Sequence, residues 1–182
     1  HQREFLEGAI RCAQWIETNL IRDERGCHCL TRPDGDGGFG KLPFTGVAHG
    51  ISGVAHFFLL LYKAAGDDIW AKLAREILAT LVHHALPDKG GLNWSMLLGE
   101  QVLDRCQWSH GSPGIGLIFL LAYEVLQDPS YYEIAQKCGT TTLAYGDFRN
   151  NITQCIGLSG CGELFIELYR VSKEESWLGH AT

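Results

Sequence analysis

Histidine, arginine and cysteine occur at three short glycine-rich segments of the chain. The first segment holds His49, the second holds His110 with Arg105 shortly before it, and the third holds Cys155. A histidine can accept and donate a proton near neutral pH, and an arginine can stabilise a negative charge that develops during a reaction. A cysteine can act as a thiol or as a metal ligand. If one fold brings the three segments together, we expect these residues to line a shared pocket.

The three segments share a glycine pair followed by an apolar run. The pairs are Gly50 and Gly53, Gly111 and Gly114, and Gly157 and Gly160, and the apolar runs end at Tyr62, Tyr123 and Tyr169. Glycines placed in this way suit a tight turn that enters a helix, or a helix start packed closely against a neighbour. A helix that is apolar on most sides is a buried helix. The repeat therefore predicts three buried helices, each starting at a glycine turn.

Amphipathic segments alternate with these apolar ones. Residues 3–20 place Phe5, Ala9, Ala13, Ile16 and Leu20 on one helical face, and residues 67–86 repeat the pattern. Asp67 suits the cap of the second such helix, Asp128-Pro129 is a typical start of a third, and residues 174–182 begin like a fourth. The alternation predicts an all-α fold with an outer and an inner ring of helices. We expect an α/α toroid of helical hairpins, of which this chain holds about three.

Two long links, residues 22–45 and 87–107, lead into the first and second glycine turns. Links of this length in compact domains are often functional loops, so we expect the site where they converge on the turns. No segment alternates long enough for a sizeable sheet, although residues 90–95 are not clearly helical. Residues 1–182 are interpreted as a single domain, a fragment truncated at one or both ends.

Composition excludes several classes of protein. The formal net charge of -6 and the pI near 5.7 argue against a general nucleic-acid binder, which needs a basic face. The longest apolar run, residues 53–62, contains His56 and is shorter than the roughly 20 residues that span a bilayer. Seven scattered cysteines, with no secretion signal, indicate reduced thiols in a cytoplasmic protein. Cys27-His28-Cys29 lacks a second pair at zinc-finger spacing, so we interpret it as a loop with two thiols.

At the glycine turns the sequence resembles the lanthionine synthetase C (LanC-like) family, whose fold is a double ring of α-helices. The family carries a His-Gly turn, a Trp-Cys-x-Gly turn and a Cys-His-Gly turn. Here these read Ala48-His49-Gly50, Trp108-Ser109-His110-Gly111 and Cys155-Ile156-Gly157, with Pro113-Gly114 after the second turn as in the family. The resemblance covers residues 3 to 175, and complete members are longer, with seven hairpins.

The resemblance implies a zinc site that this chain does not preserve. The family's three zinc ligands correspond to Ser109, Cys155 and Ile156, of which only Cys155 is a good ligand. We therefore expect no metal cofactor, unless Cys155 and His110 rebuild a site with a neighbour such as Cys106. The cyclase domains of the family's kinase–cyclase fusion synthetases also lack these ligands. The kinase or lyase part of a larger synthetase is thus an expected partner.

By the same resemblance, His49 corresponds to the histidine proposed as acid and base, and Arg105 to an arginine near the reaction centre. Trp108 and His110 are expected to contact the substrate. The residues alone also allow plainer roles, a helix-start imidazole bonded to backbone for His49 and a loop ion pair for Arg105.

The implied activity is a cyclase that adds cysteine thiols of a precursor peptide to dehydrated Ser or Thr residues, which forms thioether rings. Two alternatives remain at this point. One is a catalytically silent toroid that binds a peptide or a partner. The other is a carbohydrate-active toroid that uses the carboxylates of Glu163 and Glu167, although an i,i+4 pair on one helix is more simply a polar lining of a cavity.

Overall fold

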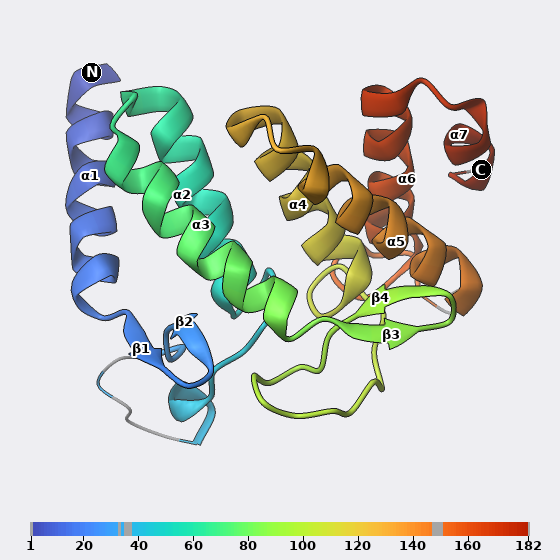
Figure 1. Cartoon of the computed structure of the whole chain (residues 1–182), viewed down its shortest axis with the longest axis horizontal. Helices are drawn as coiled ribbons and strands as arrows, with labels where there is room; N and C mark the ends of the chain where they lie inside the picture. Colours follow the sequence, from blue (N-terminus) through green and yellow to red (C-terminus); the bar gives the residue numbers. More distant parts are fainter. Residues whose placement is uncertain (1, 33, 35–37, 147–150, 182) are drawn as a thin grey trace.

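The structure, a computed structural model, describes residues 2–32, 34, 38–146 and 151–181. This described part is mainly helical, as the sequence predicts, and Figure 1 shows its helices following one another across the molecule. The helices are α1 (Gln2–Thr18), α2 (Ile51–Ala65), α3 (Asp68–His83), α4 (Ser112–Leu126), α5 (Pro129–Tyr145), α6 (Leu158–Ser172) and α7 (Glu175–His180). A short 3-10 helix, η1 (Gly38–Lys41), lies between α1 and α2. Within the described residues, no helix combines the length and apolar character needed to cross a membrane.

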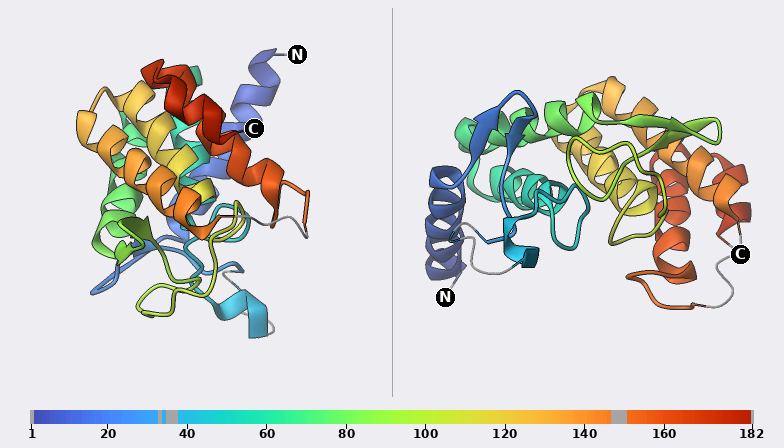
Figure 2. Two further views of the ribbon diagram at one scale, coloured as in Figure 1. Left: turned by 90° about the vertical axis from the view of Figure 1, so that its right-hand side faces the viewer. Right: turned by 90° about the horizontal axis from the view of Figure 1, so that it is seen from below.

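The helices form two layers. In the inner layer α4 lies between α2 and α6 and contacts both, while α3, α5 and α7 pack on α2, α4 and α6 from outside. Figure 2 shows the layers curving into an open arc, with α1 at one end and α7 at the other. The predicted alternation of outer and inner helices is therefore present, and closure of the arc into a toroid stays a prediction.

The helix starts follow the sequence signals. The Asp67 side chain accepts a 3.1 Å hydrogen bond from the Ile69 backbone N–H, and Asp128 accepts one of 3.0 Å from Ser130. Each of these aspartates therefore caps an outer helix. The inner helices instead start directly after Gly50, Gly111 and Gly157, none of which offers a side-chain cap. The capped starts of α3 and α5 therefore differ from the glycine starts of the inner helices, while α7 starts without a side-chain cap.

The predicted apolar face of α1 is wrong at Phe5. This side chain is 76% exposed, whereas Ala13 is fully buried. The face of α1 that packs against the core passes through Leu6, Ala9, Ile10, Ala13 and Ile16, and Phe5 lies to one side of it. Among the helices α1 packs chiefly on α2, so nothing in the described part of the chain covers the side that carries Phe5.

Two small hairpins occupy the long links. Strands β1 (Ile21–Asp23) and β2 (Gly26–His28) pair antiparallel, as do β3 (Leu86–Asp88) and β4 (Gly91–Asn93). The β2 strand packs on α3 and β4 packs on α5. Farther along, the two links pair with each other at a bridge between Phe44 and Leu97. The links therefore converge just before the glycine turns, as the sequence predicts.

The repeated glycine pair has a common physical cause. A Cβ atom at Gly53 would collide with the carbonyl oxygen of Val47, one at Gly114 with that of Trp108, and one at Gly160 with that of Gln154. In each case the oxygen belongs to the residue six positions earlier, so the incoming chain folds back directly over the first turn of the inner helix. A side chain at the second glycine would push this segment off the helix.

We predict that Gly114→Ala destabilises the protein by about 1–3 kcal/mol, because the added methyl group has no space beside the Trp108 carbonyl. Gly8→Ala is the matched control. Gly8 lies inside α1, where a Cβ would meet only the end of the Arg11 side chain at 3.8 Å, and removing a helical glycine stabilises by about 0.5–1 kcal/mol. Urea unfolding followed by circular dichroism measures both changes. Equal effects of the two substitutions would contradict the proposed fold-back.

Candidate functional site

The three glycine turns lie against one another at one end of the inner helices. The Ser109 backbone N–H donates a 2.9 Å hydrogen bond to the Cys155 carbonyl, which joins the second turn to the third. The Ala48 N–H approaches the Ser109 carbonyl at 3.5 Å, which joins the first turn to the second. The second turn therefore lies between the other two.

Glycines again permit these contacts. A Cβ atom at Gly46 would collide with the Ser109 carbonyl and lie 3.0 Å from Nδ1 of His110. A Cβ atom at Gly160 would lie 2.6 Å from Cβ of Trp108. The backbone of the first turn and the start of α6 thus both press on the second turn, and neither leaves room for a side chain.

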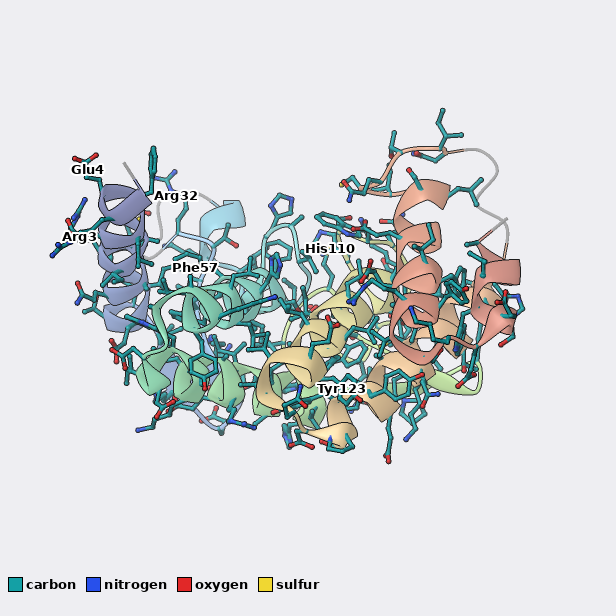
Figure 3. All side chains as sticks on the ribbon, turned by 90° about the horizontal axis from the view of Figure 1, so that it is seen from above. Arg3, Glu4, Arg32, Phe57, His110 and Tyr123 are labelled. Atoms are coloured by element: carbon teal, nitrogen blue, oxygen red, sulfur yellow. The ribbon has the colours of Figure 1, made fainter. Side chains whose placement is uncertain are left out.

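The packing of the first two turns brings two imidazole rings together. The ring centroids of His49 and His110 are 5.7 Å apart. Phe44 packs on both, at 6.2 Å from His49 and 5.7 Å from His110. His49 is exposed and His110 is 8% exposed, so the pair has one open and one buried member. Figure 3 places His110 in the concave side of the arc, between the starts of α2 and α6.

The surroundings of His110 favour its neutral form. Burial is the main cause that lowers the pKa of this imidazole, and the nearby His49 and Arg105 lower it further, while Asp104 opposes them weakly. Its Nδ1 atom is buried against Gly46 and has no hydrogen-bond partner among the described residues. His110 therefore remains uncharged at neutral pH.

Arg105 forms an ion pair in the second link. Its guanidinium is 45% exposed and faces the Asp104 carboxylate at 3.6 Å. The loop ion pair that the sequence allows is thus present. The positive charge of the same guanidinium also lowers the pKa of His110, so Arg105 acts on this imidazole through its charge.

Asn93, on β4, holds the second turn and was not identified from the sequence. Its fully buried side-chain amide donates 2.9 Å hydrogen bonds to the Arg105 carbonyl and to Asp88, and its oxygen accepts from the backbone and hydroxyl of Ser112. In the first and third turns the corresponding helix-start N–H, of Ile51 and Leu158, donates to the carbonyl seven residues earlier. In the sequence, this residue is recognisable only as a polar amide side chain between the apolar Leu92 and Trp94.

The positions that correspond to the family's zinc ligands lie together, but their residue types do not suit zinc. Ser109 is 2% exposed, Cys155 is exposed and Ile156 is 43% exposed. Across the described part of the chain, no three His, Cys, Asp or Glu side chains group so as to hold a metal ion. Cys27-His28-Cys29 is not the loop that the sequence predicts, because Cys27 and His28 belong to strand β2. His28 is instead fully buried, 3.2 Å from the carboxylate of Asp23.

Two cavities flank the first turn, and Val47 lines both. One, of ≈ 400 Å³, is lined by His49, Cys29 and residues of α2. The other, of ≈ 350 Å³, is lined by Trp108, Glu163 and Glu167 with apolar residues of α4. The plainer interpretation of Glu163 and Glu167, as polar residues lining a cavity, is confirmed.

The fold is similar to a solved structure, that of nisin cyclase. The TM-score is 0.66 at 20% identity, and the match covers 77% of this chain and 38% of that chain. The chain belongs to the lanthionine synthetase C-like family, because residues 17–181 match the family profile described as "Lanthionine synthetase C-like protein". It is also 25% identical over 138 residues to "Glutathione S-transferase LANCL1" of Danio rerio, which covers 76% of this chain and 33% of that relative.

We predict that the double variant Ser109→Cys, Ile156→His gains a zinc site with the native Cys155, since three good ligands then meet at turns that already touch. Dialysis followed by elemental analysis should give one zinc ion per chain, bound at least about 100-fold more tightly than by the native chain. Ser109→Cys with Ile166→His is the control, because Ile166 is 50% exposed on α6, away from the turn. Equal zinc binding by the two double variants would show that the turns do not correspond as assigned, and one tightly held zinc ion in the native chain would contradict the expected loss of the site.

Proposed function

We propose that this chain is the part of a thioether-forming cyclase that adds a cysteine thiol of a peptide to a dehydrated Ser or Thr residue. The observation that carries the proposal is the contact of His49 and His110, two imidazoles from different turns whose ring centroids are 5.7 Å apart. Family membership and the fold shared with nisin cyclase support it.

The reaction makes four chemical demands. The thiol must lose its proton, the sulfur must bond to the β-carbon of the dehydrated residue, and the negative charge that moves to the carbonyl oxygen must be stabilised. The α-carbon then takes a proton, so the overall change is addition of S–H across a double bond. One group that accepts and later returns a proton meets the first and last demands.

His49 is the proposed proton carrier. It is exposed and lines the cavity beside the first turn, whereas His110 is buried and kept neutral. A positive charge on His49 lowers the pKa of His110, so a proton on His49 disfavours a second one on the buried ring. The proposed part of Arg105 is to stabilise the oxygen anion, and that of Trp108 and His110 is to contact the peptide. The step uses no metal-bound thiolate, because the residues at the family's zinc positions do not fit zinc.

The names of the similar proteins describe a cyclase and an enzyme that transfers glutathione, which is itself a thiol. An external thiol is therefore an alternative nucleophile in the same reaction. The proposed substrate is a precursor peptide, and the proposed partner is the kinase or lyase part of a larger synthetase. All seven cysteines are free thiols, which suits a reducing compartment such as the cytoplasm.

A second candidate is a silent module that binds peptide without converting it. The replacement of two zinc-ligand positions by Ser109 and Ile156 favours it. The carbohydrate-active alternative gains no support, because Glu167 accepts a 2.7 Å hydrogen bond from Arg170 and lies on the same helix as Glu163.

We predict that the chain accelerates loss of the free thiol from a peptide that contains one cysteine and one dehydroalanine. Alkylation of the remaining thiol and mass spectrometry measure this loss. His49→Gln should slow the reaction by about 100-fold, the usual contribution of a positioned acid or base. His83→Gln, at the exposed end of α3, should leave the rate unchanged. Adding glutathione in a parallel reaction distinguishes ring closure from transfer by product mass.

The pH dependence gives a second readout of the same assay. The rate should fall as pH drops through the pKa of His110, because a positive charge on His110 opposes proton uptake by the neighbouring His49. The positive charge of Arg105 lowers the pKa of His110, so Arg105→Gln should move this acid limb to higher pH. Peptide binding without any acceleration would favour the silent module, and an unchanged rate in His49→Gln would overturn the assigned role.

A further inference from the structure

The ≈ 350 Å³ cavity between the inner helices has an apolar floor and a charged rim. Its lining comes from the first two turns and from α2, α4 and α6, with Val47, Leu117, Ile118 and Leu121 as apolar members. The charged members all lie toward α6 and the end of α4, namely Glu124, Glu163, Glu167 and Arg170. A ligand that fits such a cavity has an apolar stem and a charged end.

The rim carries more negative than positive charge. Arg170 donates 2.7 and 2.6 Å hydrogen bonds to the two Glu124 oxygens and one of 2.7 Å to Glu167, so a single guanidinium serves two carboxylates. Lys63 also lies near enough to Glu124 to lower its pKa. Three carboxylates therefore face two cations, which leaves a surplus of one negative charge.

That surplus belongs to Glu163. Its carboxylate accepts a 2.7 Å hydrogen bond from the side-chain amide of Gln154, which is neutral and does not balance the charge. Burial lowers the pKa of His56, the remaining titratable member of the lining, so His56 adds no positive charge at neutral pH. An incoming cation is the partner that completes this rim.

The cavity borders the proposed reaction site. Val47 lies two residues before His49 and lines both cavities, and Trp108 lies two residues before His110. A peptide that presents one residue to the imidazole pair can therefore place a neighbouring side chain in this cavity.

We propose that this cavity is a subsite for a lysine side chain of the peptide substrate, with the methylene groups on the apolar floor and the ammonium at Glu163. The identity of the peptide rests on the proposed function, but the preference for an aliphatic ammonium does not. The experiment therefore begins with small probes that require no reaction.

The first arm measures binding of n-hexylammonium and of 1-hexanol to the native chain. The indole N–H signal of Trp108, assigned with Trp108→Phe, reports occupancy in nuclear magnetic resonance titrations. Hexylammonium should bind about tenfold more tightly than hexanol, the effect of a hydrogen bond to a charged group. Glu163→Gln should reduce this ratio to about one without weakening hexanol. Glu133→Gln, on the exposed face of α5, should keep the ratio.

The second arm uses the thiol-loss assay with paired peptides that differ only in lysine or norleucine at positions flanking the reacting residues. At one position lysine should lower KM severalfold without changing kcat, and Glu163→Gln should remove that advantage. If hexylammonium binds no more tightly than hexanol, or if the Glu163→Gln variant still binds hexylammonium more tightly than hexanol by the same ratio, the subsite is refuted. If the probes behave as expected and no peptide reacts, the subsite stands and the proposed function fails.

Discussion

The close approach of backbone to backbone at the glycine turns is the constraint on which the rest of this structure depends. Each inner helix starts beneath a segment whose carbonyl, six residues before the second glycine, occupies the space of a missing Cβ. The same absence of side chains lets the Gly46 backbone and the start of α6 press on the second turn. A methyl group at these positions would separate elements whose contacts define the site. The glycines are therefore as much a part of the site as the side chains that do chemistry.

This packing explains how a residue of one turn changes the pKa of a residue in another turn. His49 and His110 belong to turns separated by two helices, yet their rings contact each other and Phe44. Burial keeps His110 neutral while His49 stays open to solvent. An asymmetric pair of this kind suits the movement of one proton. The proposed subsite for a lysine side chain is lined by Val47 and Trp108, which belong to the first two turns. The same turns would therefore position both the reacting groups and the neighbouring side chain of the substrate.

The sequence was informative where local rules decide structure. Aspartate caps at Asp67 and Asp128, the glycine starts of the inner helices and the alternation of layers were all read from spacing and residue type. The apolar face of α1 was misjudged at Phe5, because periodicity does not say which neighbours cover a helix. The hairpin β1–β2 was not located, and for β3–β4 the sequence indicated only that short strands were possible around residues 90–95, since strands of three residues are too short to show alternation.

The site was only partly accessible to sequence reasoning. The turns could be recognised as similar, and the family resemblance implied that Ser109 and Ile156 occupy zinc-ligand positions. The contribution of Asn93 could not, because a single amide gains meaning only when β4 is seen to place it under the second turn. The neutral state of His110 likewise follows from burial that no local pattern encodes.

The most direct test of the central claim is whether the rings of His49 and His110 contact each other in solution. A nuclear Overhauser spectrum of the chain with isotope-labelled histidine, assigned with His49→Gln and His110→Gln, measures this contact. The structure predicts cross-peaks between the two rings, and from each of them to Phe44. A well-folded chain in which His110 shows cross-peaks to Phe44 but none to His49 would contradict the joined turns and the proton-carrying pair built on them.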